Sequence, residues 1–156
     1  MSSIIGFISI IYLFFTFEKF FFKNNKIFNY FFFFTFWFYP FLHSRTSSEN
    51  ISLSLFIISF CILFKFISEK KELFNTYTFS LASFLLGISM VFKFTTVFSA
   101  LPIFLWLVIF NFNIKKIFIF CFIILIALSA GLFVDYYHWG FLTNTYYQFY
   151  FHNLSH

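Results

Sequence analysis

The sequence predicts an all-α fold, a polytopic membrane helical bundle that forms a single transmembrane domain over residues 1–156. Of these residues 62% are hydrophobic and only 10% are charged, whereas about a quarter of the residues in a soluble domain are charged. The apolar residues are gathered into six runs, and the basic residues lie in the gaps between them. There is too little charge to cover a globule in water, so we expect about six transmembrane helices.

The six apolar runs are near residues 3–17, 27–42, 50–67, 76–92, 96–112 and 117–134. A helix needs about 20 residues to cross the hydrocarbon core, and several runs reach that length only with flanking Lys, Tyr or Trp residues that can snorkel. Lipid offers no water to unpaired backbone groups, so the runs are expected to be helices. The continuous Phe, Ile and Leu stretches also disfavour a β-barrel, whose strands alternate polar and apolar residues.

The first run lacks the basic start and the small-residue cleavage site of a signal peptide, so we expect it to be a span. Eight of the ten basic residues follow the odd-numbered runs, namely Lys19, Lys23, Lys26, Lys65, Lys70, Lys71, Lys115 and Lys116. The even-numbered gaps hold only Arg45 and Lys93. The positive-inside rule therefore predicts cytosolic Lys-rich loops, with the N-terminus and the C-terminal tail on the other side.

The net charge of +5 follows from this split, so no nucleic-acid partner is expected. Cys61 and Cys121 both lie inside apolar runs, and we interpret them as small buried hydrophobic residues. Because the sequence has no CxxC motif or Cys/His cluster, neither a disulfide nor a metal site is expected. No cofactor is expected either.

The third run is preceded by residues 43–50, the most polar stretch of the chain. Thr46-x-x-Glu49 has the pattern of a capping box, and Arg45 lies four residues before Glu49. One interpretation is a well-capped helix entry at the membrane border. The other is that Arg45 faces a cavity and binds an anionic lipid phosphate through its guanidinium fork. The sequence leaves both open.

Lys93 stands between the fourth and fifth runs, followed by Thr95 and Thr96. One interpretation is a lysine that snorkels from a tight turn between two helices. The alternative is a phosphate contact, because charges at the membrane border tend to be functional. Pro102 follows within the fifth run, where a membrane helix tolerates it.

The last run is followed by an aromatic tail, residues 135–156, which we interpret mainly as an interfacial belt along the membrane surface. Asp135 is notable because only it and Glu49 are acidic on the predicted non-cytosolic face. Sequons at Asn50 and Asn153 fall on the same face, although a short pattern of this kind is weak support.

Three patches on the predicted non-cytosolic face resemble, in the same order, the motifs of one family. Ser44-Arg45-Thr46-Ser47-Ser48-Glu49-Asn50 resembles its Arg-Thr-x-Ser-Asn patch. Gly87-Ile-Ser-Met-Val-Phe-Lys93-Phe-Thr95, followed by Leu101-Pro102, is similar to its Arg-Pro-Thr segment and later Leu-Pro. Asp135-x-x-x-Trp139-Gly140, followed by Phe151-His152-Asn153, resembles its Asp-x-x-x-Tyr-Gly segment and later Asn. The family is the dolichol-phosphate-mannose-dependent mannosyltransferases, glycosyltransferase family 22. The tail looks most like that of the enzymes that add the third mannose of the glycosylphosphatidylinositol (GPI) anchor.

The resemblance implies a GT-C-like fold in the endoplasmic reticulum (ER) membrane and a mannosyltransferase role in GPI-anchor biosynthesis. Mannose would pass from dolichyl phosphate mannose to a GPI glycolipid precursor in the lumen. Arg45 and Lys93 would hold the lipid phosphate. A lumenal structural or acceptor-orienting role is implied for four further residues, Glu49, Asp135, Trp139 and Asn153. The catalytic residue is left unassigned.

The chain departs from the family pattern at several points. Lys93-Phe94-Thr95 stands where the family has Arg-Pro-Thr, and Trp139 replaces a tyrosine. The His-Pro-Asp-Glu motif, which carries the presumed catalytic acid of the family, does not occur in this sequence. We therefore expect the chain to correspond to part of such an enzyme and to transfer little mannose alone.

Two alternatives stay open. One is a mannosyltransferase of the same family that acts on the N-glycan precursor. The other is a non-catalytic membrane subunit or a transporter component, and a transporter would require polar residues that face one another inside the bundle.

Overall fold

The computed structural model describes residues 2–21, 48–68, 76–93, 95–109 and 114–140. Within these ranges the regular elements are five helices and no strand, which confirms the all-α prediction for this part of the chain. The helices are α1 (Ser2–Phe21), α4 (Ser48–Ser68), α5 (Thr76–Phe92), α6 (Thr96–Ile109) and α7 (Ile114–Trp139). Each coincides with one of the predicted apolar runs. The run at 27–42 lies outside the described residues, as do Arg45, Asn153 and the tail beyond Gly140.

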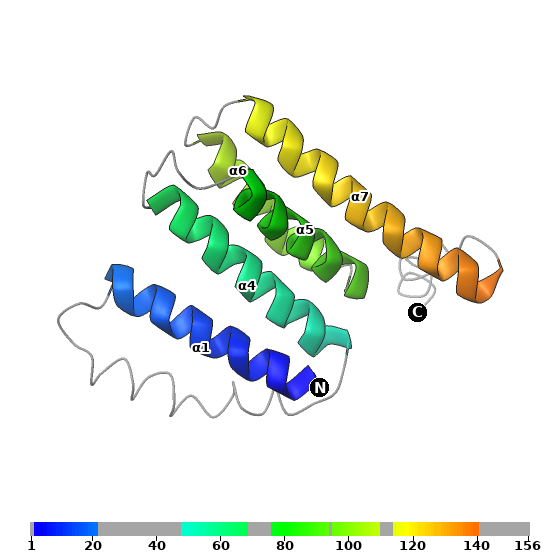
Figure 1. Ribbon diagram of the computed structural model, residues 1–156, viewed down its shortest axis with the longest axis horizontal. Coiled ribbons are helices and arrows are strands. Elements are labelled where there is room, and N and C mark those ends of the chain that lie inside the picture. Colours follow the sequence, from blue (N-terminus) through cyan, green and yellow to red (C-terminus); the bar gives the residue numbers. More distant parts are fainter. Residues whose placement is uncertain (1, 22–47, 69–75, 94, 110–113, 141–156) are drawn as a thin grey trace, which may run out of the picture.

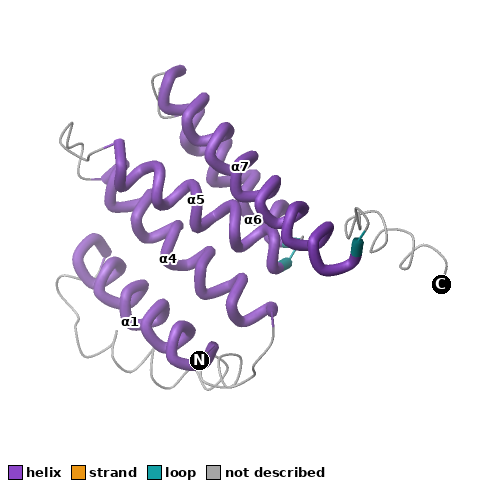
Figure 2. The backbone as a smooth tube through the Cα atoms, turned by 45° about the vertical axis from the view of Figure 1, so that its right-hand side comes forward, coloured by secondary structure: helices purple, strands orange, loops and turns teal. Residues whose placement is uncertain are grey.

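The helices α1, α4, α5 and α7 lie side by side in a row, and α6 packs against α4 and α5 (Figures 1 and 2). Figure 1 shows that α1, α4 and α6 run in one direction along the bundle, while α5 and α7 run in the other. The shared direction of α1 and α4 agrees with their prediction as the first and third spans.

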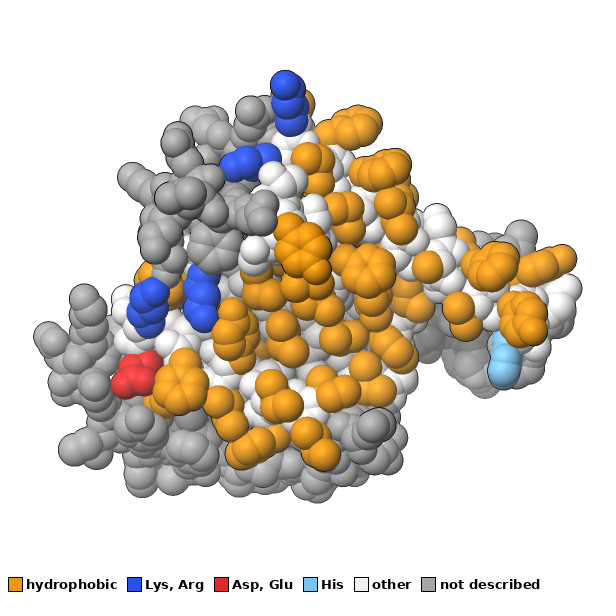
Figure 3. All heavy atoms as spheres, viewed as in Figure 1, with side chains coloured by type: hydrophobic (Ala, Val, Ile, Leu, Met, Phe, Trp, Pro, Cys, Tyr) orange, Lys and Arg blue, Asp and Glu red, His pale blue; other side chains and the backbone are white. Residues whose placement is uncertain are grey.

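The charged residues of the described helices gather at the two ends of the bundle. The end at which α1 and α4 finish and α7 begins is called the lysine end, because it carries Lys19, Lys65, Lys115 and Lys116. The end at which α4 begins and α5 turns into α6 is called the turn end, and it carries Glu49 and Lys93. Figure 3 shows an apolar surface between the ends.

Two of the described helices are long and apolar enough to cross a membrane. The window Ser48–Lys65 of α4 has a mean hydropathy of 1.5, and the window Ile114–His138 of α7 reaches 3.0. The helices α5 and α6 are apolar but shorter, with 17 and 14 residues. Only 11% of the α7 window is buried inside the bundle, against 39% of the α4 window. Of these two long helices, the one with the higher mean hydropathy is therefore also the less buried one.

The exposed surface of α7 carries large apolar side chains along most of its length. Phe118 is 74% exposed, Phe133 69% and Leu125 59%. A contiguous apolar patch of this kind marks a contact surface for a membrane or another protein. Because α7 lies at the edge of the row, Cys121 is only half-buried, in contrast to the expectation from sequence, whereas Cys61 on α4 is fully buried.

Serine hydroxyls join α4 to α5. Ser52 Oγ donates a hydrogen bond of 2.7 Å to the carbonyl of Ser89, and Ser59 Oγ donates one of 2.7 Å to the carbonyl of Ala82. Ser52 and Ser59 are seven residues apart, which places them on the same face of α4. All three serines are fully buried. Small hydroxyl residues let two helix backbones approach closely while the buried polar atoms stay hydrogen-bonded.

Glycines bring α5 and α7 into close contact. A Cβ atom added at Gly87 would lie 2.6 Å from the Cβ of Ala127, and one added at Gly131 would lie 2.6 Å from Cγ1 of Val91. Ala127 and Gly131 are four residues apart and form a small-xxx-small pattern, which is typical of close helix packing in membranes. The contact therefore depends on the absence of side-chain atoms at these glycines.

Aromatic rings join α1, α4 and α6 near the lysine end. The Phe64 ring of α4 lies 6.3 Å from the ring of Phe17 and 5.3 Å from that of Phe20, both on α1. It also stacks on Trp106 of α6, with 5.9 Å between the ring centroids. Beside this cluster, the ammonium of Lys65 lies 4.1 Å from the centre of the Tyr12 ring, a favourable cation–π geometry.

We predict that Gly87→Val lowers the free energy of unfolding by about 1–3 kcal/mol, the usual cost of overpacking a close contact. The added atoms would meet Ala127 and the backbone of Ile124. The measurement is unfolding in mixed micelles followed by circular dichroism. Ala130→Val is the matched control, because Ala130 is a small residue of α7 that is exposed. An equal loss in both variants would contradict the proposed role of the glycine contact.

Candidate functional site

The first turn of α4 places a carboxylate at the turn end of the bundle. Glu49 is the second residue of the helix, where a negative charge interacts favourably with the helix dipole. Its side chain is 66% exposed, whereas the neighbouring Asn50 is only 4% exposed. The helix therefore begins with one acidic side chain turned outwards and one amide turned into the bundle.

A short hydrogen-bonded turn joins α5 to α6. The backbone N–H of Lys93 donates to the carbonyl of Ser89 at 3.1 Å, and that of Thr96 donates to the carbonyl of Lys93 at 3.1 Å. The Thr96 hydroxyl donates to the same two carbonyls, at 3.2 Å for Ser89. The last carbonyls of a helix have no hydrogen-bond donor within the helix. Here the Thr96 hydroxyl is one of the donors to the Ser89 carbonyl. The position of Lys93 is fixed by these bonds.

The carbonyl of Ser89 connects three helices. It accepts hydrogen bonds from Ser52 Oγ of α4 at 2.7 Å, from the Lys93 N–H at 3.1 Å, and from Thr96 Oγ1 of α6 at 3.2 Å. The beginning of α4, the end of α5 and the beginning of α6 therefore meet at one oxygen atom. As a result, the first turn of α4 and the α5–α6 turn lie within side-chain reach of each other.

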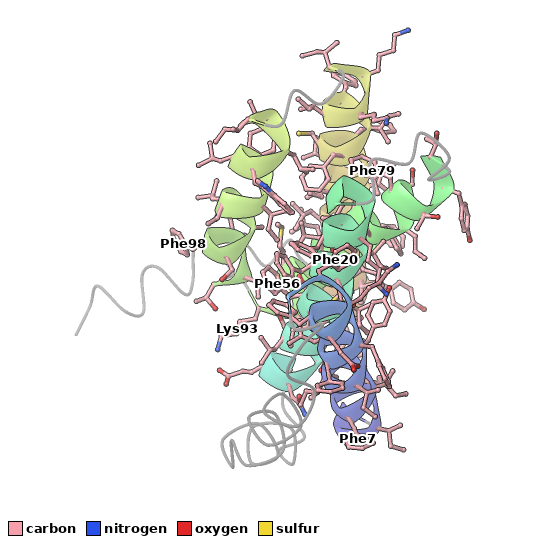
Figure 4. The ribbon with its side chains drawn as sticks, turned by 90° about the vertical axis from the view of Figure 1, so that its left-hand side faces the viewer. Phe7, Phe20, Phe56, Phe79, Lys93 and Phe98 are labelled. Carbon is pink, nitrogen blue, oxygen red and sulfur yellow. The ribbon has the colours of Figure 1, made fainter. Side chains whose placement is uncertain are left out.

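Lys93 and Glu49 form an ion pair across this junction, with 2.6 Å between Nζ and Oε1. The lysine side chain is 36% exposed and the glutamate side chain 66%. Figure 4 shows Lys93 on the side of the bundle occupied by α6. A pair this exposed in water contributes about 0.2–1 kcal/mol, and salt weakens it. Its main effect on the site is that the lysine charge is balanced by a carboxylate.

Sequence reasoning related Glu49 to Arg45 and Thr46, its neighbours in the chain. The structure pairs it with Lys93, which is 44 residues away. The sequence did contain a signal for this ion pair. Charged residues are scarce, and Glu49 and Lys93 have opposite charges and lie in gaps predicted to be on the same side of the membrane. Lys93 lies in a tight turn between two helices, the location required by the snorkelling interpretation. The capping box and the phosphate contact of Arg45 involve residues outside the described ranges.

The third predicted patch lies at the end of α7. Asp135 is half-buried and stands one helical turn beyond Gly131, which contacts Val91 of α5. Asp135 to Trp139 therefore continue α7, although the sequence placed them in the tail. The helix stops at Gly140, whose φ of 73° is the left-handed conformation of a helix C-terminus, and its N–H donates to the carbonyl of Tyr136 at 2.8 Å.

The described part of the turn end thus contains the Glu49–Lys93 ion pair and a polar turn. The half-buried Asp135 lies near the end of α7. Within the described ranges there is no group of three or more His, Cys, Asp or Glu side chains that could hold a metal ion. The first and second patches meet through Glu49 and Lys93. Comparison with known protein families, with curated proteins and with solved structures gave no match.

We predict a small and salt-sensitive coupling between Glu49 and Lys93. In a double-mutant cycle with Glu49→Gln and Lys93→Gln, the coupling free energy should be between about 0.2 and 1 kcal/mol at low salt, and it should fall as salt is added. Unfolding in mixed micelles gives the four free energies. Lys116→Gln, combined with Glu49→Gln, is the control for charge removal, because Lys116 lies at the lysine end. A Glu49–Lys93 coupling of zero at low salt would contradict the pairing.

Proposed function

We propose that the chain is a multi-pass protein of the ER membrane, with the lysine end in the cytosol and the turn end in the lumen. The observation that carries this proposal is the exposure of α7. The segment Ile114–His138 of α7 is long enough to cross a membrane and has a mean hydropathy of 3.0, yet only 11% of it is buried inside the bundle. In water such a helix would leave its apolar side chains hydrated. In a membrane the same side chains would contact lipid acyl chains, which are also apolar.

The way the helices pack supports the same proposal. Lipid tails are as apolar as leucine, so helices in a membrane associate through close backbone contacts and hydrogen bonds rather than through the hydrophobic effect. Both devices occur here, as glycine contacts between α5 and α7 and as serine bonds between α4 and α5. The positive-inside rule assigns the lysine end to the cytosol.

We predict opposite accessibility for the two ends in intact microsomes, whose outer surface is the cytosolic side. In a background without Cys61 and Cys121, Lys116→Cys should react with a membrane-impermeant maleimide before permeabilisation. Lys93→Cys should react only afterwards. Attachment of an N-glycan at Asn153 would be a second sign of a lumenal tail. Equal labelling of both cysteines in intact microsomes would contradict this orientation.

For the activity, we propose that the turn end takes part in mannose transfer from dolichyl phosphate mannose to a GPI glycolipid precursor. The resemblance of the three sequence patches is the basis. The contact between Glu49 and Lys93 supports it, because two patches far apart in the chain meet at one end of the bundle. Positive groups there would hold the departing lipid phosphate, and a carboxylate would accept the proton of the acceptor hydroxyl.

The buried hydroxyl groups favour this proposal over a transporter component. Every fully buried serine or threonine in the described ranges donates to a backbone carbonyl, and these residues are Ser9, Thr16, Ser52, Ser54, Ser59, Ser83 and Ser89. Hydroxyls used in this way stabilise helices and their contacts. They do not line a path for a polar solute.

We predict that the chain in nanodiscs binds dolichyl phosphate mannose through the turn end. Lys93→Gln should weaken binding by about tenfold or more, the usual effect of losing a hydrogen bond to a charged group. Binding of radiolabelled donor is the measurement, and the transfer of label to glycolipid in microsomes tests the acceptor side. Lys116→Gln, which removes the same charge at the lysine end, is the control. If the two variants bind equally well, the proposed phosphate site is wrong.

A further inference from the structure

The described helices α6 and α7 differ so much in length that they cannot both match the thickness of one bilayer without tilting. With a rise of about 1.5 Å per residue, α6, with its 14 residues, is about 21 Å long, and α7, with its 26 residues, is about 39 Å long. The hydrocarbon core of a typical bilayer is about 30 Å thick. In such a bilayer α7 is long enough to cross with a tilt, whereas α6 is too short by about 9 Å.

Polar residues limit the apolar length of α6 at both ends. On the turn side, Thr96 is held by its bonds to the carbonyls of Ser89 and Lys93. On the other side, Asn111 and Asn113 precede Lys115 in the sequence. Between Thr96 and Asn111 the sequence holds 14 residues, of which only Ser99 is polar. The apolar segment is therefore about as long as the helix itself.

The outer face of α6 would be in direct contact with lipid. Phe98, Leu101 and Leu105 are 65%, 52% and 56% exposed, and Ile109 is 72% exposed. Their spacing of three and four residues places them in one strip along the helix. Figure 4 shows Phe98 pointing away from the bundle. No other described helix covers this strip. In a membrane, the acyl chains that contact it would have to match its length.

Tilting cannot resolve this mismatch. A helix that is too long for a bilayer can tilt, but tilting a short helix reduces its span further. In a thick bilayer, the ion pair of Lys93 and Glu49 would be drawn towards the hydrocarbon, where charged groups are unfavourable. A thin bilayer avoids this, and α7 adapts to it by tilting.

We propose that the surface of α6 selects a thin bilayer, with short-chain phospholipid as the partner that fits it. This inference rests on the proposed membrane location and does not depend on mannose transfer. It also agrees with the proposed ER location, because the ER membrane is a few ångström thinner than an average bilayer.

The test uses the full chain in phosphatidylcholine vesicles whose acyl chains have about 14 to about 22 carbons. Two measurements are made across the series. One is the midpoint of unfolding. The other is the quenching of Trp106 by brominated lipid, in a variant with Trp37→Phe and Trp139→Phe, which reports the depth of α6. The unfolding midpoint should be highest in the two shortest lipids and should fall as the chains lengthen.

Two insertion variants give a matched comparison. Four apolar residues inserted between Val108 and Ile109 lengthen α6 by about 6 Å, and the stability optimum should move to longer lipids. The same insertion between Phe133 and Val134 lengthens α7, which is already long enough, and should leave the optimum in place. All four flanking side chains are exposed, so each insertion is made at a surface position. If an insertion variant does not fold, the wild-type series still decides the question.

The outcomes separate this inference from the proposal on which it rests. If the chain is retained in all vesicles but its stability is constant or rises with lipid length, the inference is overturned and the membrane location stands. Equal shifts in both insertion variants also overturn it. If carbonate extraction releases the chain from every vesicle, the membrane location fails and this inference fails with it.

Discussion

The packing of α5 against its two neighbours is the constraint on which the rest of the described structure depends. On one side it accepts serine hydrogen bonds from α4, and on the other its Gly87 lies against Ala127 of α7. Both contacts require very small side chains, because any larger residue would separate the backbones. They fix where α5 ends, and hence where the turn carrying Lys93 lies relative to the start of α4.

The position of the ion pair follows from this packing. Ser52 on α4 and Ser89 on α5 are joined by a hydrogen bond, and each lies within about one helical turn of a charged residue, Glu49 and Lys93 respectively. An exposed ion pair contributes little to stability, so it does not hold the helices together. The helix contacts hold the two charges together, and a bound anion would have to compete with a carboxylate already in place.

Composition and charge predicted the helices but not their contacts. Long apolar runs must be helical in lipid, so α4, α5 and α7 could be placed in the sequence with small errors at the ends. From the sequence, Asp135 is assigned to the tail because the apolar run ends at residue 134, although neither Gly nor Pro occurs between Asp135 and Gly140. The Glu49–Lys93 pair was not predicted, because it depends on which helix faces meet. In runs this rich in Phe, Ile and Leu, periodicity does not distinguish one face from another.

The serine bonds between α4 and α5 also bear on the order in which the bundle assembles. Before α5 is in place, the hydroxyls of Ser52 and Ser59 can be satisfied only within their own helix, by bonding a carbonyl one turn earlier. In the folded bundle both hydroxyls instead donate to carbonyls of α5, so each would exchange its partner when α5 packs against α4. In the proposed membrane setting, α4 would enter lipid with these two hydroxyls bonded within its own helix, and its packing would be completed when α5 joins it. The helices α4 and α5 would then form a helical hairpin in which the packing of α4 is complete only after α5 has joined it.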